Sequence, residues 1–112
     1  MTGTHIIIDI SNIIDNQKLK YNHSVIPILN KIVEKYNLNV VGKAIHQFEP
    51  FGVTAVYILA ESHLSIHTFV DERKVAIDLY TCNQFNDLYD IEMFFKSLFN
   101  NECNMTYKII AR

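Results

Sequence analysis

The extended segments of this chain place an aliphatic side chain at every second position, and this alternation constrains the fold more than any other feature. Side chains point alternately to the two faces of a β-strand, so residues two apart share a face. The clearest cases are residues 4–10, with Ile6, Ile8 and Ile10, and residues 74–82, with Val75, Ile77 and Leu79. The opposite faces collect imidazoles, carboxylates, a thiol and aromatic rings. We therefore expect a sheet with one face covered by helices and another that is half exposed to water, a binding site or a subunit interface.

Two helices are expected where apolar residues recur at three- and four-residue steps. The first runs from Val25 to Tyr36, with Ser24 as its N-cap and Pro27 tolerated in its first turn. The second runs from Leu88 to Leu98, with Asp87 as its N-cap. A loop rich in Asn, Lys and Asp precedes the first helix.

The expected strands are Thr4–Ile10, Val40–Phe48, Gly52–Ala60, Leu64–Phe69, Lys74–Thr81 and Met105–Ile110. A turn with Pro50 and Gly52 joins the second strand to the third. The element order is then β-α-β-β-β-β-α-β. This order favours an α+β fold, a two-layer sandwich in which two helices cover one face of a mostly antiparallel sheet. We expect residues 1–112 to form a single domain.

Composition excludes several classes of protein. Hydrophobic residues make up 49% of the 112 residues, which is too many for a disordered chain. The formal charge is −2 and no basic run occurs, so nucleic acid is not an expected partner. Neither a membrane-spanning segment nor a signal peptide is evident. Cys82 and Cys103 do not make a disulfide framework, so a cytoplasmic, reduced protein is expected.

The reactive side chains allow more than one interpretation. His63 and His67 are four residues apart, a spacing that suits a shared metal on a helix. On a strand, four residues span about 13 Å, so no metal site is expected. Cys82 is either a nucleophile activated by His67 or a small buried hydrophobe. Strand parity places Cys82 and His67 on the same polar face.

One stretch narrows these alternatives. Residues 61–68 read E-S-H-L-S-I-H-T and resemble the self-cleavage motif E-S-H-x-x-I-H-T of the S-adenosylmethionine decarboxylases, the pyruvoyl-dependent enzymes of polyamine synthesis. Residues 78–82, D-L-Y-T-C, are similar to the D-x-F-T-C segment of that family, and residues 48–54, F-E-P-F-G-V-T, to its F-x-P-x-G-x-S segment. The chain resembles the short prokaryotic-type sequences most strongly from residue 48 to residue 82.

The resemblance implies that the chain is a zymogen that cuts itself between Glu61 and Ser62. The Ser62 hydroxyl would attack the Glu61 carbonyl to form an ester, and elimination would release a β chain of residues 1–61. Residue 62 would become a pyruvoyl group at the head of an α chain of residues 62–112. His67 matches the family residue that assists processing. Thr54 stands where the family has a helping Ser and keeps its hydroxyl.

The resemblance also implies how the processed enzyme works. The pyruvoyl carbonyl would form a Schiff base with the substrate amine and draw electrons as carbon dioxide leaves, without a metal. Cys82 matches the proton donor of the family. Phe48 and Phe69 match the aromatic walls that grip the adenosyl group, and Asp71 stands in place of the Glu that holds the ribose.

Substrate and partners remain open at this level. Val70 and Asp71 replace the Pro and Glu of the family, so the same machinery acting on ornithine or arginine is an alternative to S-adenosylmethionine. A third alternative is a non-catalytic homologue that regulates or stabilises a partner. For the enzyme, the resemblance implies a homodimer of processed protomers with sites at or near the interface, in the biosynthesis of spermidine.

Overall fold

The computed structural model describes residues 3–82, 85 and 87–112. The elements follow one another as β1 (Thr4–Ser11), η1 (Asn16–Leu19), α1 (Asn22–Lys35), β2 (Val40–Gln47), β3 (Val53–Leu59), β4 (His63–Phe69), β5 (Lys74–Thr81), α2 (Leu88–Ser97) and β6 (Asn104–Ala111). The expected order of strands and α-helices is confirmed. The short 3-10 helix η1 lies where only a loop was expected.

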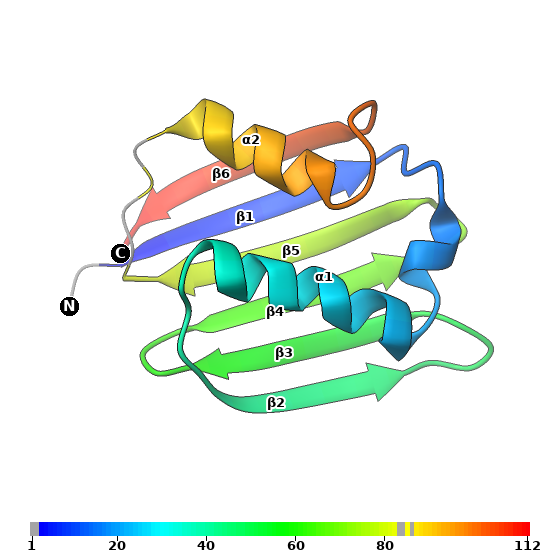
Figure 1. Cartoon of the computed structure of the whole chain (residues 1–112), viewed down its shortest axis with the longest axis horizontal. Helices are drawn as coiled ribbons and strands as arrows, with labels where there is room; N and C mark the ends of the chain where they lie inside the picture. The colour runs from blue at the N-terminus through cyan, green and yellow to red at the C-terminus, as the bar shows by residue number, and fades with distance from the viewer. Residues whose placement is uncertain (1–2, 83–84, 86) are drawn as a thin grey trace.

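The strands form one six-stranded sheet in the order β2-β3-β4-β5-β1-β6. Every neighbouring pair is antiparallel. Figure 1 shows both α-helices on the same face of this sheet, α1 across its middle and α2 over β1 and β6. The predicted α+β sandwich with two helices on one face is therefore confirmed. We call the other side of the sheet the open face.

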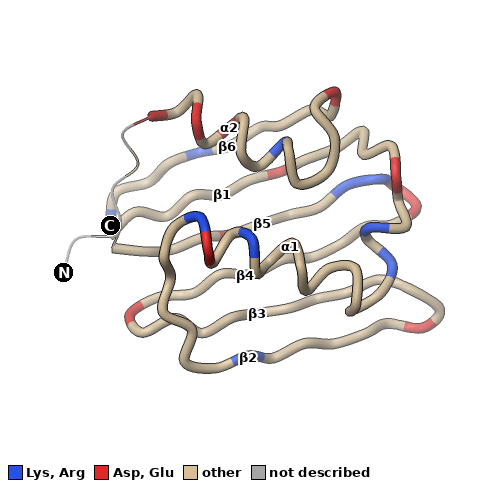
Figure 2. Tube along the Cα trace, in the orientation of Figure 1, with Lys and Arg blue, Asp and Glu red and all other residues tan. Residues whose placement is uncertain are grey.

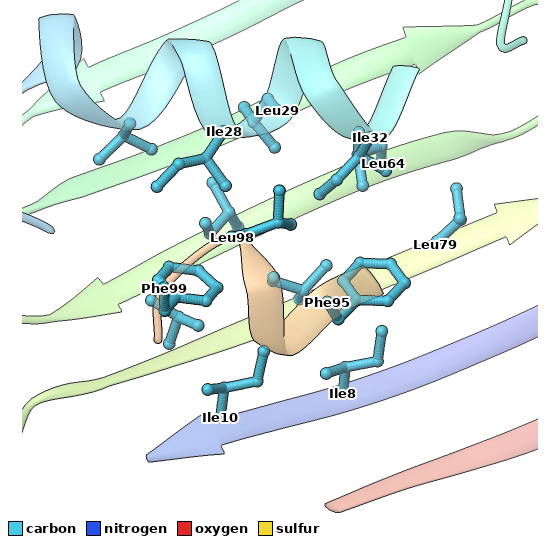
Figure 3. Close-up of a cluster of buried hydrophobic side chains, with 14 of the residues drawn as sticks. Ile8, Ile10, Ile28, Leu29, Ile32, Leu64, Leu79, Phe95, Leu98 and Phe99 are labelled. Carbon is cyan, nitrogen blue, oxygen red and sulfur yellow. The ribbon is translucent and has the colours of Figure 1, made fainter. Parts of the chain in front are cut away.

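The hydrophobic core fills the space between the sheet and the helices. The aliphatic rows expected from the alternation, including Ile6, Ile8 and Ile10 of β1, are fully buried. Figure 3 shows Phe95, Leu98 and Phe99 in one cluster with Ile8 and Ile10 of β1. The same view places the α1 side chains near β4 and β5. The apolar face of the sheet, which comes from the two-residue alternation, thus packs against the apolar faces of the two helices, which come from the helical periodicity.

The first helix begins earlier than the sequence pattern predicts. α1 begins at Asn22, with Tyr21 as an N-cap that makes no side-chain cap bond, so the Ser24 cap is wrong. The Asn22 backbone N–H donates instead to Oε1 of Gln47 in β2, 2.8 Å away. Because a distant residue satisfies this first-turn donor, no local capping residue is required. Pro27 consequently lies in the second turn rather than the first.

The other element ends agree with the sequence to within about one residue, the usual uncertainty of such boundaries. The Asp87 cap of α2 is confirmed, since its side chain accepts from the Asp90 backbone N–H at 3.1 Å. Gly52 follows the β2–β3 turn with φ of 112°, a conformation that favours glycine.

Charged residues lie mainly on the helices and in the connecting loops (Figure 2). In the part of the chain that the structure describes, no helix has the length and apolar character needed to cross a membrane.

Candidate active site

The residues singled out by sequence fall into two groups at opposite ends of the sheet. We call Glu61, Ser62 and Cys82 the cleavage-end cluster, and Thr54, His67, Phe48, Phe69 and Asp71 the histidine-end cluster. Figure 1 shows the reason: the β3–β4 turn and the end of β5 lie at one edge of the molecule, and the β2–β3 and β4–β5 turns lie at the other.

The cleavage-end cluster is built on the tight turn between β3 and β4. The Leu59 backbone N–H donates to the Ser62 carbonyl at 3.0 Å, and the Ser62 N–H donates back to the Leu59 carbonyl at 3.4 Å. Glu61 is exposed at the tip and Ser62 is half-buried. The bond between them therefore sits in a turn held at both sides, beside a cavity of about 180 Å³ that Thr81 and Cys82 also line.

Cys82 lies immediately after β5 and contacts the turn directly. Its thiol donates to Oε2 of Glu61, with 3.1 Å between sulfur and oxygen. This hydrogen bond raises the pKa of the Cys82 thiol, and burial and the Glu61 charge raise it further, by smaller amounts. A thiol held protonated at the predicted cleavage bond is chemically suited to donate a proton and poorly suited to act as a nucleophile.

In the histidine-end cluster, a hydroxyl and an imidazole face each other. Thr54 of β3 and His67 of β4 are directly paired in the antiparallel register. Oγ1 of Thr54 lies 3.1 Å from Nδ1 of His67. Side chains opposite one another on antiparallel strands come close enough for such contacts. The two residues that the resemblance assigns to processing are thus brought together.

A cavity of about 240 Å³ opens at the same edge and is lined by Phe48, Phe69 and Asp71, among others. Both rings are well exposed, Phe48 by 47% and Phe69 by 40%. The Lys74 ammonium lies 5.1 Å from the centre of the Phe69 ring. The cavity therefore offers aromatic surface and a carboxylate to a ligand, with a cation already placed against one ring.

The two clusters do not meet within one chain. Residues 62 and 67 are five apart along extended backbone, which separates them by about 17 Å. His67 pairs with Ala76 in β5, six residues before Cys82, so the distance to the thiol is about 20 Å. Cys82 and His67 belong to the same side-chain rows, as parity predicts, but parity does not measure distance along a strand. His67 therefore does not contact Ser62 or Cys82 in a single protomer.

Two further sets of residues border the cleavage end without having been assigned a role. The Asn37–Asn39 loop lines the cavity beside Ser62, and its Asn39 carbonyl accepts from the Ala60 N–H at 3.0 Å. His5, His63 and Tyr80 form a row of rings on the open face, with centroids 5.9 to 6.0 Å apart. The alternation predicts which face of the sheet these rings occupy. No local sequence pattern predicts that the Asn37–Asn39 loop lies next to Ser62.

Among residues 3–82, 85 and 87–112, no group of three or more His, Cys, Asp or Glu side chains is arranged to hold a metal ion. The two cysteines, both in the described part of the chain, do not form a disulfide with each other.

Comparison with a solved structure agrees with this architecture. The adenosylmethionine decarboxylase from Aquifex aeolicus VF5 superposes with a TM-score of 0.81 and 27% identity, over 96% of this chain and 88% of that one. The fold is thus that of a decarboxylase scaffold already seen in a crystal.

The sequence comparisons define the family. The family model for S-adenosylmethionine decarboxylase matches residues 4–112. An S-adenosylmethionine decarboxylase proenzyme from Thermodesulfovibrio yellowstonii is 38% identical over 82 residues, which are 73% of this chain and 60% of that protein. One from Clostridium botulinum is 32% identical over 95 residues, 85% of this chain and 81% of that protein. The chain belongs to the S-adenosylmethionine decarboxylase family, and its matched part spans about 60% of the first of these relatives.

Proposed function

We propose that this chain is the precursor of a pyruvoyl-dependent S-adenosylmethionine decarboxylase that cuts itself between Glu61 and Ser62. The observation that carries the proposal is the contact of the Cys82 thiol with Glu61, 3.1 Å long, at the bond to be cut. Family membership supports the same activity, and the three related proteins described above are all named for S-adenosylmethionine. None is named for ornithine or arginine.

Processing would begin with attack of Oγ of Ser62 on the Glu61 carbonyl carbon. The peptide C–N bond breaks, an ester C–O bond forms and the Ser62 nitrogen becomes an amine. Loss of the Ser62 α-proton and of the ester oxygen then releases residues 1–61 with a new carboxylate and leaves residue 62 as dehydroalanine. Its imine tautomer would take up water and lose ammonia, which gives the pyruvoyl group. A serine hydroxyl requires a nearby base for such an attack, and the paired Thr54 and His67 side chains of a second copy of the chain would supply one.

The residues around Ser62 fit the group that would form there. Ser62 is half-buried at a cavity that Cys82 also lines, so a carbonyl at this position would have a proton donor beside it. When formed, the pyruvoyl group supplies the electron sink for loss of carbon dioxide. Cys82 would return a proton to the decarboxylated carbon. Phe48 and Phe69 would stack on the adenine ring and Asp71 would accept hydrogen bonds from the ribose hydroxyls.

The separation of the two clusters leads us to propose a composite site made by two copies of the chain. His67 cannot assist Ser62 across about 17 Å, because proton transfer requires hydrogen-bond reach of about 3 Å. A twofold axis that lies between two open faces and runs across the strands sets the cleavage end of one copy over the histidine end of the other. Sheets packed face to face lie about 10 Å apart, a gap that the facing side chains fill.

The open face is suited to such an interface. Ile58 of β3 is 52% exposed there, although it is a large aliphatic residue. A face-to-face pairing would bury it and would close each active site from water. We further propose that the homodimer works in the cytoplasm, where Cys82 stays reduced.

The intact mass of purified protein tests the proposal. The expected result is two fragments, one ending at Glu61 and the other beginning with a carbonyl that reacts with hydrazine. The Ser62→Ala variant should stay as one chain of 13.0 kDa. An uncut wild-type chain would instead support the non-catalytic homologue. Release of labelled carbon dioxide from ornithine or arginine, but not from S-adenosylmethionine, would overturn the proposed substrate.

A further inference from the structure

Glu61 has two chemically distinct parts at the cleavage end. Its backbone carbonyl belongs to the bond that is to be cut, whereas its side-chain carboxylate accepts the hydrogen bond from the Cys82 thiol at 3.1 Å. The contact joins residues 21 positions apart, so the fold and not the local sequence creates it. Glu61 thus takes part in the processing step and also contacts the Cys82 thiol, which acts after processing.

We propose that Glu61 is a positioning residue: its side-chain carboxylate holds the Cys82 thiol protonated in the cavity beside the cleavage bond. The proposal rests on the proposed function and extends it, because the motif assigns Glu61 only the carbonyl side of the bond. A thiol held by a carboxylate has a fixed direction. A negative charge beside it also disfavours the thiolate, which would bring two negative charges together.

Keeping the Cys82 thiol protonated matters while the ester between Glu61 and Ser62 exists. A Cys82 thiolate could attack the ester carbonyl of Glu61, forming a C–S bond and breaking the ester C–O bond. The Ser62 oxygen would leave as an alkoxide and take a proton from water, and water would then hydrolyse the Cys82 thioester to free residues 1–61. Residue 62 would end as an amino-terminal serine, and no pyruvoyl group would form. A thiol that keeps its proton does not enter this branch, because the thiolate is the nucleophile.

The preference of Cys82 for the protonated form would become stronger after cleavage. Glu61 would then be the last residue of the β chain and would carry a second carboxylate, the new chain end. The charge beside the thiol would increase when Cys82 begins to serve as a proton donor. Cleavage itself would thus favour the protonation state that catalysis requires.

Among the described residues, few other titratable groups lie near Cys82. On the strands next to Cys82, the nearest row holds Tyr80 of β5, His63 of β4 and His5 of β1. The Asn37–Asn39 loop, which lines the same cavity, carries no titratable side chain. Of these neighbours, Glu61 is the one whose side chain accepts the thiol hydrogen bond described above.

The test uses the full chain with Ser62→Ala, which stays uncut and isolates the contact from processing. Iodoacetamide alkylation of Cys82 is followed against pH by mass spectrometry of the peptide that contains it. Adding Glu61→Gln should shift the pH midpoint downward and raise the rate at pH 7.5 severalfold, because the thiolate fraction changes about tenfold per pKa unit. Glu61→Asp should restore most of the wild-type profile.

Glu102→Gln is the matched control, because it removes an exposed carboxylate from the turn before β6 and should leave the profile unchanged. Buried Cys103 should stay unmodified in every variant, which shows that each one is folded. A Glu61→Gln profile that superimposes on that of the parent overturns the inference. An uncut wild-type chain overturns the proposed function but not this contact, so the two failures are distinguishable.

In the cleavable chain, Glu61→Gln should raise the share of α chains that begin with serine instead of pyruvoyl. A share equal to that of Glu102→Gln would mean that the carboxylate does not protect the ester.

Discussion

The composite site makes a quantitative prediction about mixed dimers. Ser62→Ala removes the nucleophile from one chain, and His67→Ala removes the assisting imidazole from another. Neither variant should process efficiently alone, because each of its two sites lacks one group. In a mixed dimer, however, one site joins the intact Ser62 of one copy to the intact His67 of its partner. The other site of that dimer lacks both groups.

The expected yield follows from the pairing statistics. Equal amounts of two chains that pair at random give about half mixed dimers, and each mixed dimer has one complete site, so about a quarter of all chains should be cut. Every cut chain should be the His67→Ala chain, which retains Ser62. If a single chain completed its own site, co-expression would cut neither chain beyond its level alone, since each variant would lack one group of its own site.

Two chains with distinguishable tags, co-expressed and measured by intact mass, provide the assay. The matched control pairs Ser62→Ala with Cys82→Ala: both residues belong to the cleavage-end cluster, so the mixed dimer contains no site with both. This pair should show no recovery of carbon dioxide release from S-adenosylmethionine. Absence of cutting in the Ser62→Ala and His67→Ala mixture, with mixed dimers isolated through both tags, would refute the composite site.

Two further predictions concern stability. Phe95→Ala should lower the free energy of unfolding by about 3–5 kcal/mol, because Phe95 is fully buried in the core; the control Tyr89→Ala, 71% exposed on the same helix, should change it by less than about 0.5 kcal/mol in urea denaturation. Burial and the charge of Asp90 raise the pKa of Tyr36 from 10.0 to about 12. Folding therefore favours the protonated phenol, whose contribution is complete below pH 10 and is lost as pH rises toward 12. The unfolding free energy of wild type should fall relative to that of Tyr36→Phe over that interval, and a difference independent of pH would contradict this assignment.

Much of the fold is predictable because it depends on periodicity. The isoleucines of β1 and the cap of α2 are local signals, and both agree with the structure. The start of α1 was not predictable, because its first-turn donor is satisfied by Gln47, 25 residues away. Arg73 is similar: at φ of 54° it donates to the Ile13 carbonyl at 3.3 Å, and nothing near it in the sequence indicates that partner.

The candidate site shows the same division between local and distant information. The motif predicts Ser62, His67 and Cys82 as site residues, and alternation predicted the faces of the neighbouring strands correctly. The rise of a strand already separates Ser62 from His67, five residues further on, by about 17 Å, but neither the motif nor the alternation shows which group lies beside each of them. The contact of Cys82 with Glu61 depends on where the β3–β4 turn meets the end of β5, which only the assembled sheet determines.

The strand order has a consequence for the proposed cut chain. The fragment that ends at Glu61 would hold β1, α1, β2 and β3, and the other would hold β4, β5, α2 and β6. Yet β1 lies between β5 and β6, so both of its neighbours would belong to the other fragment. Pulling the pieces apart would require breaking the ladders on both sides of β1 and the ladder between β3 and β4. Strands of the two fragments would therefore alternate within one sheet, so the fragments should stay together after the peptide bond at Glu61 is cut.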